Sequence, residues 1–130
     1  MPTSALISIV EDDAHFRESM RWLLCSLGFR VEVFSSAADL LTSSRLAETA
    51  CLIADVNMPA MTGIELHKTL IEAGRAIPTI LITGAPNDVD RARCKDRGII
   101  CYLSKPVDEN QLTQCIEAAL TVAIRREENL

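Results

Sequence analysis

Four positions along the sequence carry side chains that could do chemistry together. Carboxylates occupy positions 11 to 13 and position 55, a hydroxyl follows at Thr83, and an amine at Lys105. Carboxylates that share one site repel each other unless a cation lies among them. Oxygen ligands without His or Cys favour Mg2+ or Mn2+ in octahedral geometry, with several waters retained. The residue types therefore predict a site for a hard divalent cation.

Such a site suits phosphoryl transfer, which depends mainly on positioning and on charge neutralisation. In this interpretation Asp55 is the nucleophile and forms an acyl phosphate. The metal and Lys105 would neutralise the equatorial phosphoryl oxygens, and the Thr83 hydroxyl would donate a hydrogen bond to one of them. We therefore expect Glu11, Asp12, Asp55, Thr83 and Lys105 to lie together.

Each of these residues also has an ordinary alternative role. Asp55 could simply open a turn, Thr83 could be a strand-end hydroxyl, and Lys105 could be a solvated charge. The acidic run at 11–13 could begin a helix, where the helix dipole favours negative charge. Their joint occurrence at the ends of four predicted strands favours a site over four separate accidents.

Asp55 is expected where a buried strand ends. The apolar run 50–54 before it is too short for a helix and suits a strand that is covered on both faces. Pro59 lacks a backbone N–H and restricts the conformation of Met58 before it. The strand therefore cannot continue past the carboxylate.

The rest of the chain alternates between strand and helix patterns. Predicted strands cover residues 5–10, 29–34, 50–55, 78–83 and 99–103, and predicted helices cover residues 16–27, 36–48, 63–73, 87–97 and 108–123. Strict alternation makes 29–34 a half-exposed edge strand. This order predicts one α/β domain with an open parallel sheet covered on both faces. In such sheets the site lies beyond the carboxyl ends of the strands, where the strand order reverses.

The helices differ in how well they can be anchored. Two apolar faces are clear, one made by Phe16, Met20, Leu23, Leu24 and Leu27 with Trp22 outside it, and one by Ile64, Leu66, His67, Leu70 and Ile71. His67 is thus expected to be a partly buried packing residue rather than a ligand. The segment 87–97 has few apolar residues among many charges, so this helix should be weakly anchored.

Composition narrows the class of protein. The 130 residues suit one domain, and the net charge of −5 argues against nucleic-acid binding by this chain itself. No apolar run approaches the length of a membrane span, and residues 1–4 do not resemble a signal peptide, so we expect a cytoplasmic protein without a membrane partner. The five cysteines are odd in number and widely spaced, and we expect reduced thiols rather than a disulfide or a zinc site.

Four motifs resemble the receiver domain of two-component response regulators, over nearly the whole chain. They are Ile9-Val10-Glu11-Asp12-Asp13, then Asp55-Val56-Asn57-Met58-Pro59 with Gly63, then Ile82-Thr83-Gly84, and Tyr102-Leu103-Ser104-Lys105-Pro106. The resemblance implies a flavodoxin-like (βα)5 fold with strand order 2-1-3-4-5. It also implies a receiver domain over 1–124 and a charged tail or linker start over 125–130.

The resemblance assigns roles residue by residue. It implies that Asp55 is the phosphoacceptor, that Glu11, Asp12, Asp55 and the main-chain carbonyl of Asn57 hold the metal, and that Lys105 and Thr83 contact the phosphate. Thr83 and Tyr102 are similar to the family's switch pair, Pro59 and Gly63 belong to its structural positions, and the Lys105–Pro106 bond is commonly cis there. Glu11 departs from the Asp found in many receivers, although Glu is also common at this position.

The leading functional hypothesis is a signalling switch, phosphorylated on Asp55 by a histidine kinase or a histidine phosphotransfer protein. It would catalyse its own phosphorylation and dephosphorylation without being a conventional enzyme. A small phosphohydrolase with an aspartyl-phosphate intermediate is an alternative, but Asn57 stands where known examples carry a second Asp. A second alternative is a degenerate receiver that acts as a constitutive interaction module. The intact set of Asp, Thr and Lys argues against this alternative.

The expected readout is a shifted surface. Thr83 would move towards the phosphoryl group and vacate space into which Tyr102 turns, with the weakly anchored helix 87–97 repositioned. Tyr102 could instead be an ordinary packing residue with a solvated hydroxyl. The pattern is most similar to receivers that precede a LuxR-type helix-turn-helix, a stand-alone receiver is equally compatible, and the face 87–120 is a candidate dimer surface.

Overall fold

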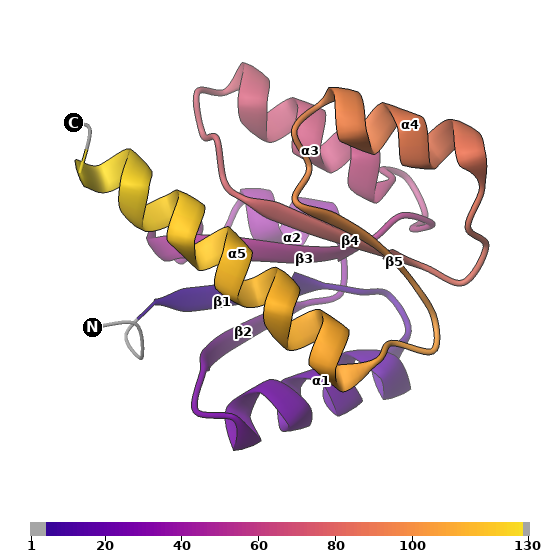
Figure 1. The fold of residues 1–130 in the computed structure, drawn as a ribbon, viewed down its shortest axis with the longest axis horizontal. Coiled ribbons are helices and arrows are strands. Elements are labelled where there is room, and N and C mark those ends of the chain that lie inside the picture. The colour runs from indigo at the N-terminus through magenta and orange to yellow at the C-terminus, as the bar shows by residue number, and fades with distance from the viewer. Residues whose placement is uncertain (1–4, 129–130) are drawn as a thin grey trace.

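A five-stranded parallel sheet with strand order β2-β1-β3-β4-β5 forms the centre of the computed structural model, which describes residues 5–128 (Figure 1). The strands are β1 (Leu6–Val10), β2 (Arg30–Phe34), β3 (Thr49–Asp55), β4 (Thr79–Thr83) and β5 (Cys101–Ser104). The helices are α1 (Ala14–Ser26), α2 (Ala37–Leu41), α3 (Gly63–Glu72), α4 (Asp88–Asp96) and α5 (Glu109–Glu128), with a short 3-10 helix η2 (Leu46–Glu48). The flavodoxin-like fold and its strand order are confirmed.

The sheet is covered on both faces, as its apolar strands require. One core cluster joins α1 and α5 to one face through residues such as Leu24 and Ile116, and a second joins α2, α3 and α4 to the other through residues such as Leu40 and Leu66. The three central strands β1, β3 and β4 are almost wholly buried, whereas β2 is partly exposed along an edge. The predicted edge position of β2 is therefore confirmed.

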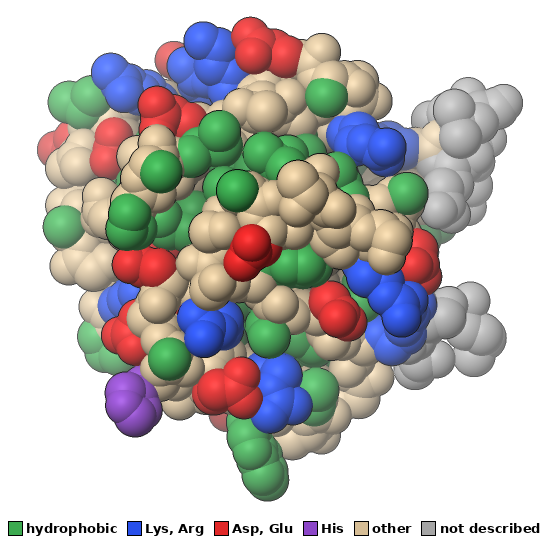
Figure 2. All heavy atoms as spheres, turned by 180° about the vertical axis from the view of Figure 1, so that it is seen from behind, with side chains coloured by type: hydrophobic (Ala, Val, Ile, Leu, Met, Phe, Trp, Pro, Cys, Tyr) green, Lys and Arg blue, Asp and Glu red, His purple; other side chains and the backbone are tan. Residues whose placement is uncertain are grey.

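The face turned away from the viewer in Figure 1 has a mixed surface. Figure 2 shows Lys and Arg side chains interspersed with Asp and Glu side chains over that face, among green apolar side chains and tan atoms of the backbone and other side chains. No helix among the residues that the structure describes is both long and apolar enough to cross a membrane.

Side-chain caps begin several of the helices. The Asp13 carboxylate accepts hydrogen bonds from the backbone N–H groups of His15 and Phe16, and the Ser36 hydroxyl accepts one from Asp39. Thr62 and Glu65 form a reciprocal capping box at the start of α3. Each cap satisfies backbone N–H groups that have no partner inside the helix.

The predicted length of the helix over 36–48 is wrong. It ends at Leu41, where Thr42 follows as the C-cap and its hydroxyl donates to the Ala38 carbonyl 2.9 Å away. Three successive hydroxyl residues, Thr42 to Ser44, offer the backbone local hydrogen bonds that compete with the helix. The chain then forms the 3-10 turn η2 before entering β3.

Smaller differences occur at the ends of other elements. Leu27 and Ile71, expected on the buried faces of their helices, are 42% and 46% exposed. Leu27 is the C-cap of α1, beyond the turns that contact the sheet. The fifth strand begins at Cys101 rather than at residue 99, because Gly98, with a φ of 74°, ends the preceding turn and Ile99 still bonds to the Cys94 carbonyl.

One expectation about the cysteines is corrected. Cys101 of β5 and Cys115 of α5 form a disulfide with a Cα–Cα separation of 6.2 Å, and Cys25, Cys51 and Cys94 are free. The pairing arises because α5 packs its apolar stripe over the sheet and brings residue 115 above β5. Sequence spacing alone gives no sign of this tertiary contact.

At its carboxyl end the chain remains helical through residue 128. The segment 125–128, expected to belong to a charged tail, continues α5, and the Arg126 guanidinium donates to the Ala76 carbonyl. Residues 1–4 of the predicted domain and residues 129–130 of the predicted tail lie outside the described residues.

Candidate functional site

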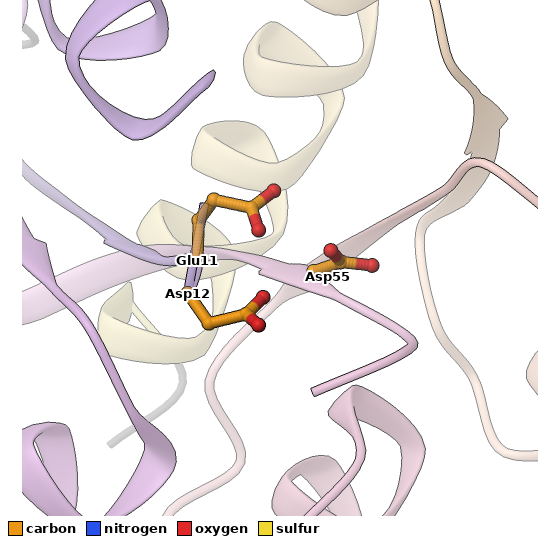
Figure 3. A group of neighbouring side chains, drawn as sticks. All are labelled: Glu11, Asp12 and Asp55. Atoms are coloured by element: carbon orange, nitrogen blue, oxygen red, sulfur yellow. The ribbon is translucent and has the colours of Figure 1, made fainter. Parts of the chain in front are cut away.

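Three carboxylates converge at the carboxyl end of the sheet. Glu11 and Asp12 follow β1, Asp55 is the last residue of β3, and one oxygen from each lies within 4.8 Å of the others. Figure 3 shows the three side chains directed towards a common space from two neighbouring segments. The predicted convergence of residues 11, 12 and 55 is confirmed. Asp13 takes no part in the cluster, because its carboxylate caps α1.

Glu11 is the most buried member of the cluster. Its residue is 2% exposed, and its second carboxylate oxygen accepts a hydrogen bond from the Asp13 backbone N–H at 3.1 Å. Burial raises the pKa of Glu11 to about 7, although the Lys105 ammonium opposes the shift. A cation beside this carboxylate would favour its ionised form.

Lys105 supplies positive charge to the cluster from the loop after β5. Its ammonium donates to Glu11 at 2.9 Å and to Asp55 at 3.2 Å. The same group lies 4.2 Å from the centre of the Phe16 ring, a distance that suits a cation–π contact. Burial disfavours the charged ammonium, but the hydrogen bonds to the two carboxylates outweigh it, and the pKa of Lys105 is raised. The peptide bond from Lys105 to Pro106 is cis, as the resemblance implied.

Asp55 is held by the turn that follows it. The Asn57 backbone N–H donates to the Asp55 carboxylate at 3.0 Å, and the Gly63 N–H donates to the Val56 carbonyl at 3.0 Å. A Cβ atom on Gly63 would lie 2.5 Å from the Asp55 carbonyl oxygen, which is closer than real Cβ atoms approach. Gly63 thus allows α3 to begin directly beneath the carboxylate, while Pro59 ends the extended segment.

Thr83 lies beside the carboxylate cluster and is linked to it through Asn57. It is fully buried at the end of β4, and its hydroxyl oxygen accepts hydrogen bonds from the Asn57 side-chain amide at 3.0 Å and the Ala85 N–H at 3.0 Å. Both bonds use oxygen lone pairs, so the hydroxyl proton remains available for donation. The Asn57 amide links this hydroxyl to the turn after Asp55.

Tyr102 faces the start of α4 rather than the carboxylates. Its hydroxyl accepts a hydrogen bond at 3.3 Å from the backbone N–H of Asn87, the residue that caps α4. The Arg91 guanidinium lies 4.9 Å from the centre of the Tyr102 ring. Both contacts tie the tyrosine to the helix that is least well packed.

The residues fit a hard divalent cation. Their donors are carboxylate oxygens from Glu11, Asp12 and Asp55, which Mg2+ prefers in proteins. A divalent cation among them would offset the mutual repulsion that Lys105 now compensates in part. The acidic cluster could therefore bind a metal.

Three contributions to the site were not expected from the sequence. Phe16 was assigned to the apolar stripe of α1, yet its ring contacts the Lys105 ammonium. The Arg17 guanidinium donates to the Glu11 carbonyl at 2.8 Å, and the Asn57 side chain binds Thr83. No pattern within a single element signals these contacts, because each joins residues from different turns or strands.

Comparisons with known proteins agree on one family. The family model described as "Response regulator receiver domain" matches residues 7–117. The response regulator protein TmoT of Ectopseudomonas mendocina is 36% identical over 125 residues, which cover 96% of this chain and 57% of TmoT. The solved structure of the response regulator StyR aligns with a TM-score of 0.85 and 36% identity, over 95% of this chain and 63% of that one. The solved structure of FixJ-N aligns with a TM-score of 0.80 and 29% identity, over 89% of this chain and 93% of that one.

The chain spans a little over half the length of the curated relatives it matches first. The shares covered are 57% for TmoT and 56% for TodT of Pseudomonas putida.

Proposed function

The chain belongs to the response regulator receiver domain family, and from this premise we propose that it is a phosphorylation switch in which Asp55 accepts a phosphoryl group from the phosphohistidine of a histidine kinase or a phosphotransfer protein. Receiver domains of this family are phosphorylated by histidine kinases and transduce signals rather than process metabolites. The observation that carries the proposal is the convergence of Glu11, Asp12, Asp55 and Lys105 at one end of the sheet.

In the proposed reaction an Asp55 carboxylate oxygen attacks the phosphorus atom. The new O–P bond forms as the N–P bond to the donor imidazole breaks, and the imidazole leaves with the electron pair of that bond. Lys105, already 3.2 Å from Asp55, is within reach of an equatorial phosphoryl oxygen after a small movement. The Thr83 hydroxyl, with its proton available, is the second donor. Transfer to water would later reverse the modification without a separate enzyme.

Mg2+, or Mn2+ in its place, is the proposed cofactor. Glu11, Asp12 and Asp55 would hold it together with the Asn57 main-chain carbonyl, and its charge would neutralise phosphoryl oxygens. Lys105 bridges Glu11 and Asp55 and so holds the Asp55 carboxylate in position before any phosphoryl donor arrives. With the cation bound beside Lys105, the site would favour an incoming group that carries negative charge.

The proposed readout starts at Thr83. If its hydroxyl turns to the phosphoryl group, its bonds to Asn57 and Ala85 are lost, and space opens on the side of β5. Tyr102 would then rotate inward and release the Asn87 N–H at the start of α4. Because Cys94 is the buried residue of α4, this helix can move at a small cost in packing.

The partner that reads this change is proposed from the relatives. FixJ of Bradyrhizobium diazoefficiens carries the name transcriptional regulatory protein, and this chain covers 60% of it. We therefore propose a receiver over residues 1–124, followed by a linker to an output domain that binds DNA, in a protein of the cytoplasm. The switched surface, 87–120, would form a homodimer on phosphorylation, and the receiver itself would not contact nucleic acid.

The test is phosphoryl uptake from acetyl phosphate or from a phosphorylated histidine kinase, followed by intact mass and peptide mapping. We expect Mg2+-dependent addition of one phosphoryl group at Asp55 and none in Asp55→Asn. Asp13→Asn is the matched control, because Asn keeps the cap of α1 and removes an acid that lies outside the cluster. Uptake by Asp55→Asn, or turnover of a free phosphomonoester by the wild type, would refute the proposal.

A further inference from the structure

The disulfide between Cys101 and Cys115 joins the strand that carries Tyr102 to the last helix. The two residues are 14 positions apart, and the loop between them contains Lys105. The bond therefore joins α5 to the first residue of β5, which directly precedes the tyrosine. The response-regulator chemistry described above makes no use of it.

The two sulfur-bearing residues lie in different surroundings. Cys115, a residue of α5, is 6% exposed and packs in the core between α5 and the sheet. Cys101 is partly exposed on the edge strand β5. Cys101 is thus the member of the pair that a small oxidant in solvent can reach.

The free cysteines have no disulfide partner among the residues that the structure describes. Cys51 is fully buried in β3, and burial raises the pKa of its thiol to about 12. Cys94 is buried in α4, and burial likewise raises the pKa of its thiol. Cys25 is exposed on α1, but the structure forms no disulfide to it. Selective oxidation is therefore expected at the 101–115 pair.

We propose that Cys101 and Cys115 are a reversible thiol–disulfide switch that fastens β5 to α5, with hydrogen peroxide as oxidant and a dithiol as reductant. The Cys101 thiolate attacks peroxide, the O–O bond breaks, and a sulfenic acid and one water result. The Cys115 thiol then attacks that sulfur, the S–S bond forms, and the oxygen leaves as a second water. Two thiols lose two electrons and two protons, and the peroxide gains both. A dithiol restores the pair by two thiol–disulfide exchanges.

The consequence for signalling rests on the proposed function. The disulfide restrains β5 against α5. These two elements form the surface 87–120 together with α4. Inward rotation of Tyr102 and displacement of α4 would have to occur beside a strand that is covalently fixed to its neighbour. Oxidation is therefore expected to reduce the response of this surface to phosphorylation while leaving Asp55 able to accept phosphate.

Thiol counting tests the switch without reference to phosphorylation. The folded protein is treated with dithiothreitol or with hydrogen peroxide, then unfolded and alkylated with N-ethylmaleimide for intact-mass analysis. We expect five labelled thiols after reduction and three after oxidation, with peptide mapping of the 101–115 link. Re-reduction of the oxidised sample should restore all five.

Two variants make the result specific. Cys25→Ser removes the exposed free thiol and should still lose two labelled thiols on oxidation. Cys101→Ser should lose none through an intramolecular link. The proposal is overturned if peroxide leaves all five thiols free, if the loss depends on Cys25, or if dithiothreitol cannot open the link in the folded protein.

The coupling is tested by amide chemical shifts with beryllofluoride as the acyl-phosphate mimic. In reduced protein we expect changes from the neighbours of Asp55 through residues 87–104, and in oxidised protein changes confined to the neighbours of Asp55. Equal changes in both forms would overturn the coupling. A lack of any response around Asp55 in both forms would instead count against the proposed function, and thiol counting would still decide the switch.

Discussion

Asp55 depends on the absence of a side chain at Gly63. The Gly63 N–H binds the Val56 carbonyl, and the position of a Cβ atom is occupied by the Asp55 carbonyl oxygen. A glycine is needed here because of close backbone approach, since the helix begins beneath the strand end that carries the nucleophile. The geometry of the site therefore has a steric requirement as well as an electrostatic one.

Gly63→Ala should destabilise the protein by about 1–3 kcal/mol, the usual cost of forcing an extra carbon into a closely packed position. Backbone atoms, which cannot rotate away, take the contact. Urea unfolding would measure the loss. Gly84→Ala is the matched control in the same region, because its nearest neighbour would be the flexible Lys105 side chain at 3.9 Å. Equal effects of both substitutions would contradict the steric account.

His67 is a buried titratable residue outside the site. It is 5% exposed within α3, as its place on the apolar face predicts, and its Nδ1 atom has no hydrogen-bond partner. Burial, together with the nearby Arg97 and Arg126, lowers the pKa of His67 from its usual 6.5. Protonation is thus disfavoured in the folded state relative to the unfolded state.

This shift gives the stability a definite pH dependence. Below pH 6.5 His67 binds a proton in the unfolded chain, whereas folded His67 stays neutral because its pKa is lower. The neutral, buried state of His67 therefore costs no unfolding free energy above pH 6.5, and the protein loses stability as the pH falls below that value. We expect His67→Leu to remove that loss, so that the unfolding free energy of the wild type falls relative to that of the variant as the pH decreases below about 6.5. Urea titrations from about pH 8 to about pH 5 would measure it. His15→Leu, on exposed α1, is the control, and a pH-independent difference for His67→Leu would refute the argument.

At the scale of elements, α5 and β5 are joined both by packing and by a covalent bond. The disulfide closes a loop that includes the turn with Lys105. A link of this length restricts the unfolded chain and is worth about 3 kcal/mol in the chain-entropy model. The oxidised protein should accordingly be the more stable form.

We expect the unfolding free energy of the oxidised protein to exceed that of the reduced protein by up to about 3 kcal/mol. Urea unfolding with and without dithiothreitol would measure the difference. Cys101→Ser should show no such dependence on the reductant, whereas Cys25→Ser should behave as the wild type does. If dithiothreitol left the wild-type midpoint unchanged although the link was reduced, the disulfide would make no contribution to stability.

The elements that the sequence predicts well are those with a single strong pattern. The apolar runs of β1, β3 and β4 and the poor apolar content of α4 all lie within short windows. Residue 55 was predicted at a strand end because Pro59 limits the strand from one side. These features require no knowledge of which elements meet.

Where prediction failed, tertiary contact or local competition decided the outcome. The α2 helix was cut short by hydroxyl side chains that bond to the backbone, although it starts where it was predicted to start. Ile71 follows the apolar pattern of α3 but is 46% exposed. The Cys101–Cys115 link and the Phe16–Lys105 contact depend on how α5 and α1 lie over the sheet. Neither can be read from a single segment.

For the whole molecule, parallel connectivity explains why residues 94 positions apart can form one site. Every strand points the same way, so Glu11 and Lys105, which follow β1 and β5, arrive at one end of the sheet with Asp55 between them. β5 is also an edge strand beside α4, so the charged site and the outer surface share one strand. Thr83 pairs with Ser104 of β5, so in the proposed switch a change at Thr83 would lie one strand from that surface.

In the proposed dimer, the surface formed by α4, β5 and α5 would pair with the same surface of a second copy. The first turn of α4 carries Asp88 and Asp90, and its last turn carries Arg93 and Lys95. Two such helices that meet in antiparallel fashion about a two-fold axis would place acidic turns against basic turns. Val89, an apolar residue 64% exposed, lies within the acidic turn and would be covered in such a pair.

We therefore expect beryllofluoride with Mg2+ to shift the reduced protein from monomer to dimer, and added salt to weaken the dimer because its charge pairs are exposed. Val89→Asp should raise the dimer dissociation constant at least about tenfold, since it removes an apolar contact and adds a charge that must be desolvated. Sedimentation velocity would measure both effects. Trp22→Asp is the matched control, because Trp22 is an exposed apolar residue of α1, outside this surface. Equal weakening by the two substitutions, or a dimer that forms without the phosphate mimic, would show that the surface 87–120 is not the switched interface.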